Sequence, residues 1–559
     1  MCVGLAVLLA AVARLSRLDL VEFKADEASA LRLTEDMLRL GHFPETGMLS
    51  SQGILQAPHL MYILAPLVAM SRDPAVVSGG IAALNIGAVL GAGWLAWRWF
   101  GGLAAVVTTL LYAANPWAVF WSRKIWAPDF LPLLAVLLCA VVLEARGRWA
   151  TLAYPIAALA SMVHFSFLTL GPTLLAPTFV LVRGRRWWPL ALGGGAALLI
   201  LLPFLAHEQR IGWLDYPTLR YELSRHTTRM DSQGLELVLG LATGLGASTL
   251  AGVPMVRVAP SVLLEVPAVL ETALLLGALA LALQRLTRPD PNRLRLTALV
   301  VWISLPILLT VRHAFDLHDH YFLLIYPAPF LLIGAAFAWV TGRREAWARP
   351  VLACGLAAVL ATAVMQLGTV AGMYAHLDGA FDACYDLPLA GSQALAQDVV
   401  DFGQRLGATR ATVELDEADA MPIAYQLRPQ YGHLEMQHYG DLGLGAAPAA
   451  DQSATAAQVL GVWTPVNPVP DWRPRLAIVW TPPQQGVHWR VELDDGQSFN
   501  AISHTPTGER MLSWFTFEVP REVPAGVHAV TARLIDDVSG ATLAEASQWL
   551  SVNSSPRCA

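Results

Sequence analysis

The sequence predicts a mainly α-helical protein that crosses a membrane many times and ends in a soluble region. Hydrophobic residues make up 55% of the 559 residues, and only 14% are charged. The mean hydropathy is +0.49. Since soluble globular domains contain about 25% charged residues, this composition excludes an ordinary soluble protein. The net charge of -6 also excludes the basic surface that nucleic-acid binding requires, so we expect no nucleic-acid partner.

Residues 1–18 form the first helix candidate. The segment is apolar but lacks the basic n-region and the A-x-A cleavage site of a secretory signal peptide, so we expect a retained helix. It is short for a span of about 20 residues. The natural start could therefore lie upstream of Met1.

Ten further apolar runs are candidates for membrane helices, because each approaches the length that crosses a bilayer. They cover residues 76–97, 102–120, 130–144, 149–163, 165–182, 187–206, 261–284, 296–311, 321–340 and 350–372. A shorter run at 58–70 contains Pro58 and Pro66 and could either span the membrane or lie at its interface. If it does not span, the chain has eleven crossings.

The distribution of arginines predicts the orientation of these helices. In the eleven-crossing arrangement, one side collects the short arginine-containing loops around residues 98, 146–148, 183–186, 285–295 and 343–349. Because cytoplasmic loops concentrate Arg and Lys, we expect that side to be the cytoplasm. The outer side of the plasma membrane then receives segments 19–75, 121–129, 207–260 and 312–320 and everything after residue 372.

The composition changes to that of a soluble protein at about residue 376. SQALAQDVVDFGQRLG (392–407) has the pattern of an amphipathic helix and ATVEL (411–415) that of a strand, which predicts a small α/β domain at 376–465. Alternating segments separated by Gly and Pro then predict a β-sandwich-like domain at 466–559. These segments are 475–481, 488–495, 514–519, 528–535 and 548–552.

The five cysteines do not have the spacing of a metal site. They are Cys2, Cys139, Cys354, Cys384 and Cys558. Cys384 and Cys558 could pair in the predicted external region, and free thiols are an equal alternative. The sequence does not indicate an oligomeric state.

The first polar feature is the pair Asp26 and Glu27, in FKADEASALRLTEDMLRLGHFP just after the first helix. Two adjacent carboxylates at a membrane surface could act as a base or hold a cation. Alternatively, Asp26 caps the amphipathic helix that ends at Gly41, and Glu27 complements the dipole of that helix.

The second feature is NPWAVFWSRKIWAPDFLPLL, which places Arg123, Lys124 and Asp129 in one external turn. Arg and Lys suit a phosphate group, Arg as a bidentate fork and Lys as a point charge. The alternative is a pair of basic side chains that snorkel to the interface. Trp117, Trp121 and Trp126 rim this turn, as tryptophans do in an interfacial belt.

Two histidine-containing segments complete the polar features. His164 interrupts an apolar stretch, where a buried ionisable residue marks function, although at a turn it could be solvated. VRHAFDLHDHYFLLIYP carries His318, His320 and Tyr321 in another external turn. The i, i+2 spacing of the two histidines does not fit a helical metal site, so phosphate or sugar binding is favoured. All four features fall on the same predicted face.

Three segments together resemble a known family. ARLSRLDLVEFKADEASALRLTEDMLRLGHFP, SSQGILQAPHLMYILAPL and WRWFGGLAAVVTTLLYAANPWAVFWSRKIWAPDFL are similar, in wording and order, to the protein O-mannosyltransferase-like glycosyltransferases of family 39. That family includes the aminoarabinose transferases and has the GT-C fold. The resemblance covers about residues 1–372 and implies a membrane glycosyltransferase domain at 1–375 with a catalytic external loop at 19–75.

The resemblance also implies roles for the polar residues. Asp26 would be the base that deprotonates the acceptor, Glu27 a supporting group, and Asp129 the second acidic residue. Arg123, Lys124 and His164 would bind the lipid phosphate, with His164 where the aminoarabinose transferases carry Lys. His318, His320 and Tyr321 would belong to a late external loop that closes over the donor.

The implied reaction transfers a sugar from a polyprenyl-phosphate donor to a hydroxyl of a protein, lipid or glycan on the external face, with inversion at the anomeric carbon. No cofactor is certain, and a divalent ion such as Mg or Mn bridging Asp26 and Asp129 stays open. Two alternatives remain, a transporter or flippase for lipid-linked sugars and a non-catalytic cell-envelope scaffold. A transporter typically has internal repeats, and the two halves of this sequence do not match.

Overall fold

The computed structural model of the protein describes residues 1–41, 43–48, 55–145, 147–213, 215–225, 228–251 and 260–379, and shorter stretches between 388 and 552. The chain forms two compact units. The first contains residues 1–18 and 29–373, and the second contains residues 19–28 and 374–559.

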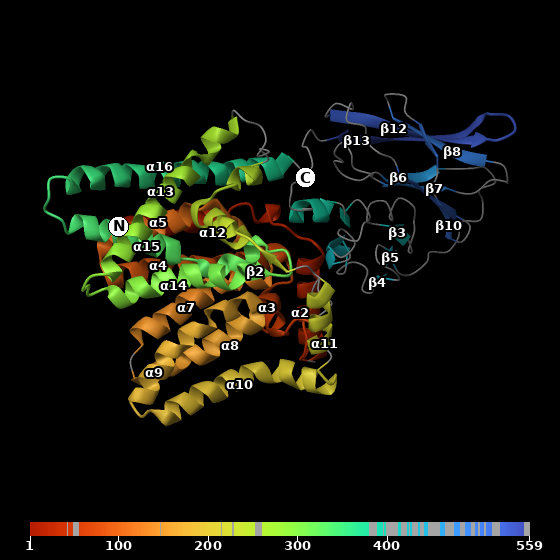
Figure 1. Cartoon of the computed structure of the whole chain (residues 1–559). Helices are drawn as coiled ribbons and strands as arrows, with labels where there is room; N and C mark the ends of the chain where they lie inside the picture. Colours follow the sequence, from red (N-terminus) through yellow and green to blue (C-terminus); the bar gives the residue numbers. More distant parts are fainter. Residues whose placement is uncertain are drawn as a thin grey trace. The chain divides into compact units, whose positions relative to one another are not determined.

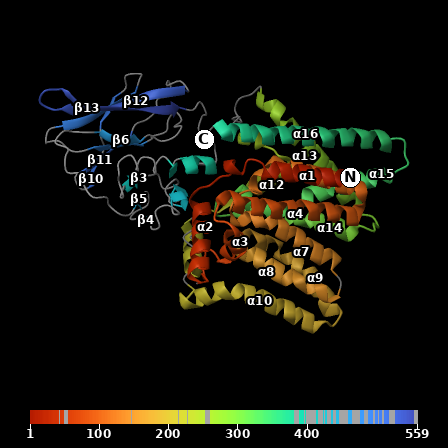
Figure 2. The same ribbon diagram turned by 180° about the vertical axis from the view of Figure 1, so that it is seen from behind.

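The first unit is a bundle of helices (Figures 1 and 2). In the N-terminal half, the elements of the chain are α1 (Cys2–Leu15), η1 (Leu18–Leu20), α2 (Ala25–Leu40), α3 (His59–Met70), α4 (Pro74–Phe100), α5 (Gly102–Ala114), α6 (Pro116–Trp121), η2 (Ala127–Phe130), α7 (Leu131–Glu144), η3 (Gly147–Leu152), α8 (Ala153–Val163), η4 (Phe165–Leu174) and α9 (Leu175–Arg183). They continue with α10 (Trp187–Arg210), α11 (Asp215–Arg225), β1 (Arg229–Met230), α12 (Gln233–Thr243), η5 (Ala247–Ala251), α13 (Pro260–Leu286), α14 (Arg293–Thr310), β2 (Arg312–His313), η6 (Asp319–Ile325), α15 (Ala328–Thr341) and α16 (Ala348–Gly379).

Among the described residues, eight helical segments are long and apolar enough to cross a membrane. They are Pro74–Phe100, Ala127–Glu144, Phe165–Arg183, Trp187–Arg210, Glu265–Leu286, Arg293–Thr310, Asp319–Thr341 and Ala348–Asp378. Helices α1, α3 and α5 are apolar but shorter. The protein is therefore a multi-pass membrane protein, and each of the ten predicted runs contains helix. The number of eleven crossings stays a prediction.

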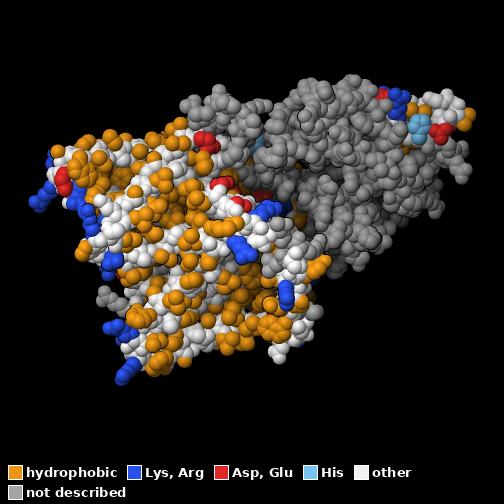
Figure 3. Space-filling view, in the orientation of Figure 1, with side chains coloured by type: hydrophobic (Ala, Val, Ile, Leu, Met, Phe, Trp, Pro, Cys, Tyr) orange, Lys and Arg blue, Asp and Glu red, His pale blue; other side chains and the backbone are white. Residues whose placement is uncertain are grey.

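The surface of the helical unit fits this assignment. Figure 3 shows hydrophobic side chains over most of its visible face, with several basic side chains at the left end and a few others on the right side of the unit. The α9–α10 and α15–α16 turns lie at that end in Figure 1, and both carry the arginines that the sequence places on one side of the membrane.

Capping and small residues explain how the central helices form and pack. Helix α4 begins where the Asp73 carboxylate accepts a hydrogen bond from the Ala75 N–H (2.9 Å), with Pro74 in the first turn. It ends at Gly101, whose φ of +100° favours glycine. At Gly334 of α15, an added Cβ would lie 2.8 Å from the Ala104 carbonyl oxygen of α5. Glycine thus allows these two helices to approach closely.

The second unit includes a piece of the N-terminal region. The Leu389 N–H donates to the Val21 carbonyl (2.8 Å), and Glu22 forms a β-bridge with Pro388. The Phe23 ring packs edge-on against Tyr425, with centroids 5.8 Å apart. Residues 19–28 are predicted to belong to the membrane domain 1–375, but these contacts attach them to the C-terminal unit.

The strands of the second unit form three antiparallel sheets, with strand orders β3-β5-β4, β10-β11-β7-β6 and β13-β12-β8-β9. Their bounds are β3 (Thr412–Glu414), β4 (Leu434–Met436), β5 (Asp441–Leu444), β6 (Val459–Trp463), β7 (Arg475–Trp480), β8 (Val487–Leu493), β9 (Ser498–Asn500), β10 (Ser503–Thr507), β11 (Arg510–Thr516), β12 (Gly526–Asp536) and β13 (Thr542–Val552).

Most of the strands predicted for the C-terminal region are present. The segment predicted at 411–415 forms β3, and the later alternating segments correspond to β7, β8, β11, β12 and β13. Strand β6 pairs with β7 across the predicted boundary at 465. Most of the predicted helix at 392–407 lies outside the described residues, as do Cys384 and Cys558. The β-sandwich arrangement stays a prediction.

Candidate active site

Asp26 and Glu27 lie in the first turn of α2 and have different environments. Glu27 is fully buried, and its Oε2 accepts a hydrogen bond from the Lys24 backbone N–H (3.2 Å). This is one half of a capping box, in which the third helical residue reaches back to the N-cap. Asp26 is exposed, and it makes no hydrogen bond or ion pair with the described residues. The structure therefore gives the capping role to Glu27 and leaves the Asp26 carboxylate available.

In the first unit, Arg123 and Lys124 are adjacent in the sequence but point to different places. Arg123 Nη2 donates to the carbonyl of Ser16 (2.8 Å) and to that of Arg17, just after α1 ends. Lys124 turns to two tryptophans, with its Nζ 4.6 Å from the ring centroid of Trp126 and 4.9 Å from that of Trp121. Both basic side chains are almost fully buried.

Asp129 is also buried, in the short helix η2 that follows these tryptophans. Its backbone carbonyl accepts a hydrogen bond from Asn85 Nδ2 of α4 (3.0 Å). The Ser78 hydroxyl, two turns earlier on α4, donates to the Arg123 carbonyl. Helix α4 therefore holds the backbone of the 121–129 turn through two side-chain hydrogen bonds.

The histidines at positions 318 and 320 contact this turn. The His320 ring centroid lies 4.4 Å from that of Trp126 and 4.4 Å from that of Tyr321. His318 stacks on His320 at 5.4 Å. His164 lies 5.8 Å from His320 and 5.7 Å from Tyr321. Three segments that are far apart in the sequence thus form one cluster, which we call the ring cluster: Trp121, Lys124, Trp126, His164, His318, His320 and Tyr321.

The contacts of His164 define its protonation. Its Nδ1 accepts a hydrogen bond from the Ser166 backbone N–H (3.3 Å) and lies 2.8 Å from the Ser166 hydroxyl. Burial lowers the pKa of His164 to about 4, because the charged imidazolium would lose its hydration. The ring is therefore neutral at pH 7 and carries its proton on Nε2. His164 can donate a hydrogen bond but does not supply a positive charge, a question that the sequence leaves open.

The ring cluster contains several hydrogen-bond donors. The Trp121 Nε1–H is buried and has no hydrogen-bond partner among the described residues. With the Lys124 ammonium and His164 Nε2–H, it brings one cation and two neutral donors to the cluster. Such a set suits an anion or a group rich in oxygen acceptors, and the buried Trp121 N–H in particular costs free energy until it is paired. Across the described part of the chain, no three His, Cys, Asp or Glu side chains are grouped as for a metal ion.

The sequence pattern does not indicate a role in the site for three residues that contribute to it. Trp121 and Trp126 have the positions expected of an interfacial belt, and that pattern does not show that they enclose Lys124. Ser166 fixes the tautomer of His164, but a serine two residues after a histidine carries no signal of its own.

The sequence matches no known family model, and it has no significant match among curated proteins. Comparison of structures does find similar proteins. ArnT from Cupriavidus metallidurans bound to undecaprenyl phosphate has a TM-score of 0.50 and 16% sequence identity, over 76% of this chain and 84% of that chain. Its apo state has a TM-score of 0.47 and 16% identity, over 72% and 79%. The Archaeoglobus fulgidus oligosaccharyltransferase has a TM-score of 0.41 and 12% identity, over 71% and 56%.

At 16% identity, the likeness to ArnT shows a shared fold and nothing finer. ArnT is a GT-C protein, and the match extends over most of both chains. The chain therefore has the GT-C fold, as the resemblance of its N-terminal segments implies.

Proposed function

We propose that the protein is an integral-membrane glycosyltransferase that moves a sugar from a polyprenyl-phosphate donor to an acceptor hydroxyl on the extracytoplasmic face. The observation that carries this proposal is the ring cluster, in which Lys124, the Trp121 N–H and His164 Nε2–H offer donors to an anion. The fold supports it, because the ArnT of the same fold binds undecaprenyl phosphate.

In this proposal the donor phosphate lies at the ring cluster. Lys124 neutralises the charge that develops on the phosphate as it leaves, and the buried setting strengthens this attraction. The two neutral donors, Trp121 Nε1–H and His164 Nε2–H, orient the phosphate oxygens. The aromatic faces of Trp126 and His320 provide apolar area for the sugar or the first isoprene units.

Other predicted residues have supporting roles. Arg123 holds the end of α1 through the carbonyls of Ser16 and Arg17 and so fixes the turn that carries Lys124. Asp129, the carboxylate of the same turn, is the second acidic residue of the proposed site after Asp26. His318 and Tyr321 pack on His320 and complete the wall of the donor site.

Asp26 is the proposed general base. It takes the proton of the acceptor hydroxyl as the oxygen attacks the anomeric carbon. The glycosidic C–O bond to the phosphate breaks on the opposite side, so the configuration inverts and the polyprenyl phosphate leaves with the bonding electrons. Glu27 caps the helix that presents this base.

The test uses purified protein in proteoliposomes and a panel of polyprenyl-phosphate sugars. Asp26→Asn should lower the transfer rate about 100-fold or more, because general bases typically contribute 10²–10⁴-fold. Asp36→Asn is the matched control, since it removes a carboxylate from the same helix, and should transfer at close to the wild-type rate. Full activity of Asp26→Asn would refute the assignment of the base. Absence of transfer from every donor by the wild-type protein would refute the proposed function.

A further inference from the structure

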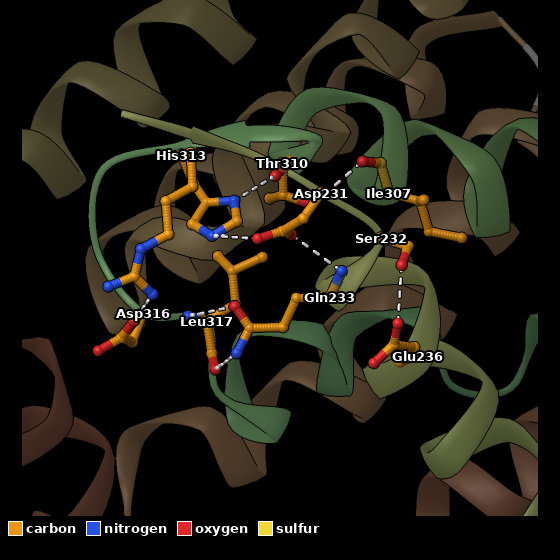
Figure 4. A network of polar contacts seen from close by, with 10 residues as sticks. Asp231, Ser232, Gln233, Glu236, Ile307, Thr310, His313, Asp316 and Leu317 are labelled. Atoms are coloured by element: carbon orange, nitrogen blue, oxygen red, sulfur yellow. Dashed lines mark hydrogen bonds and ion pairs between the residues drawn. The ribbon is translucent and has the colours of Figure 1, made fainter. Parts of the chain in front are cut away.

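The 311–318 loop joins α14 to η6 and leads directly into the ring cluster. Its last residue, His318, is the N-cap of η6 and is followed by His320 and Tyr321. The loop contains only the two-residue strand β2, so it needs contacts from elsewhere to take one conformation. These contacts come from residues 229–236, which comprise β1 and the first turn of α12 (Figure 4).

Four contacts join the two segments in addition to those of Gln233. Strand β1 pairs with β2, which aligns Arg229 with His313 and Met230 with Arg312. The Asp231 N–H donates to the Val311 carbonyl (3.2 Å). Arg229 Nη1 lies 2.5 Å from Asp316 Oδ1, and His313 Nε2 lies 3.7 Å from Asp231 Oδ2. The contact nearest the ring cluster is made by Gln233.

Gln233 holds both polar groups of the Leu317 backbone. Its Nε2 donates to the Leu317 carbonyl (3.1 Å), and the Leu317 N–H donates to its Oε1 (3.5 Å). An amide side chain with a donor and an acceptor therefore acts like a neighbouring strand. The Gln233 N–H in turn donates to Asp231 Oδ1 (3.0 Å), which fixes the start of α12 (Figure 4).

The first turn of α12 also packs closely against the loop and against η6. A Cβ added to Gly234 would lie 2.7 Å from Thr310 Oγ1, 3.3 Å from Phe322 Cζ and 3.6 Å from Leu317 Cδ1. Leu317 and Phe322 are both buried. Little free space therefore separates α12 from the residues on either side of His318 and His320, so a displacement of Leu317 would pass to the histidines.

We propose that Gln233 is a positioning residue for the donor site, which it serves by holding the Leu317 peptide and thereby the arrangement of His318 and His320. This inference rests on the proposed function for its effect on catalysis. The contact itself does not touch the donor. The contact is expected to keep the ring cluster in its binding arrangement before the donor arrives. Without it the cluster must become ordered on binding, and this ordering lowers the affinity for the donor.

The test compares Gln233→Ala with Arg229→Ala in the full-length protein. Arg229→Ala is a matched control, because it also removes a contact between the two segments. However, the Arg229–Asp316 pair is more than half exposed and bonds a side chain rather than the Leu317 backbone. Exposed ion pairs contribute little. Gln233→Glu is the third variant, since it keeps an acceptor for the Leu317 N–H but sets a carboxylate against the Leu317 carbonyl.

Two measurements decide the outcome. Binding of undecaprenyl phosphate should weaken about 10-fold in Gln233→Ala and at least as much in Gln233→Glu, but less than 2-fold in Arg229→Ala. Amide hydrogen exchange of residues 314–321 should accelerate about 10-fold in Gln233→Ala and less than 3-fold in Arg229→Ala. A residue with a merely structural role would lower the thermal stability or the active fraction and leave the dissociation constant of the remaining active protein unchanged.

Unchanged exchange and unchanged affinity in Gln233→Ala would overturn the inference. So would equal losses in Gln233→Ala and Arg229→Ala, because the effect would then be a general loosening of the segment. If the wild-type protein neither binds undecaprenyl phosphate nor transfers sugar, the proposed function fails. The exchange measurement then still tests whether Gln233 orders the loop.

Discussion

At the scale of single residues, contacts separate the roles of side chains that composition treats alike. Arg123 and Lys124 are consecutive and almost fully buried. The guanidinium of Arg123 satisfies carbonyl groups after α1, whereas the Lys124 ammonium lies against the faces of Trp121 and Trp126. A cation on aromatic faces gains electrostatic attraction without losing the ability to bind a phosphate oxygen. Arg123 therefore has a structural role, and Lys124 is the candidate ligand-binding residue of the two.

His164 gives a prediction about pH. Because burial lowers its pKa to about 4, the ring stays neutral as the pH rises from 5.5 to 8. Donor binding should therefore show no step near pH 6.5 that depends on His164. His164→Gln, which keeps a side-chain N–H donor, should bind undecaprenyl phosphate within about 3-fold of wild type, whereas His164→Leu should bind about 10-fold more weakly. Titration of binding against pH for the three proteins provides the check.

A step near pH 6.5 that disappears in His164→Gln would contradict this view. It would show that the imidazole gains a proton in the protein's working range. His164 would then supply charge to the phosphate, as the lysine of the aminoarabinose transferases is expected to do.

At the scale of helices, polar side chains inside the apolar bundle determine which helices are joined. Glu271 of α13 and Gln366 of α16 are both buried, and Gln366 Nε2 donates to Glu271 Oε2 (2.6 Å). The same Nε2 lies 3.2 Å from the carbonyl of Thr243, the last residue of α12. One amide thus links three helices. Polar contacts of this kind hold membrane helices together where the hydrophobic effect cannot.

Removing that amide should destabilise the bundle. Gln366→Leu leaves the Glu271 carboxyl and the Thr243 carbonyl without this donor, and an unpaired buried polar group costs about 1–3 kcal/mol. We expect a fall of about 3 °C in the melting temperature of the detergent-purified protein. The double variant Glu271→Leu/Gln366→Leu should recover most of that loss, because a buried polar pair can be replaced by apolar residues at little cost. A double variant less stable than Gln366→Leu would show that Glu271 has another stabilising role.

The helices themselves were predictable from sequence, because the bilayer imposes long apolar runs and each run produced helix. The packing of these helices at the site was not. The 165–182 run begins as the 3₁₀ segment η4 and the 321–340 run as η6. These 3₁₀ segments place the ring centroids of His164 and His320 5.8 Å apart. Such breaks depend on tertiary contacts, for example Gln233 with Leu317, and apolar periodicity does not reveal contacts between side chains and backbone.

At the scale of the whole molecule, the chain is not divided where its composition changes. The change near residue 376 predicts a membrane domain followed by soluble domains. In the structure, residues 19–28 form one compact unit with the residues after 373. Hydropathy could not predict this, because the attachment depends on a few pairings such as Val21 with Leu389. Asp26 and Glu27 therefore belong to the unit that contains the C-terminal strands.

This attachment predicts a catalytic role for the C-terminal unit. Phe23 lies three residues before the proposed base, Asp26. It is fully buried and packs on Tyr425. Phe23→Ala should release the 19–28 segment, because truncating a buried phenylalanine costs about 3–5 kcal/mol. We expect kcat for sugar transfer to fall about 10-fold or more while the affinity for undecaprenyl phosphate stays within 2-fold of wild type. The reason is that, in the proposed mechanism, Asp26 acts on the acceptor and the ring cluster binds the donor.

Tyr425→Phe is the matched control for this experiment, since it keeps the ring that Phe23 contacts and removes only the hydroxyl. It should retain wild-type kcat and wild-type donor affinity. If Phe23→Ala lost donor affinity and kcat in equal measure, global unfolding would explain the result. If Phe23→Ala kept full kcat, the base would not depend on the C-terminal unit, and that unit would be separate from catalysis. A fall in kcat alone would assign the C-terminal unit the task of holding the base in place.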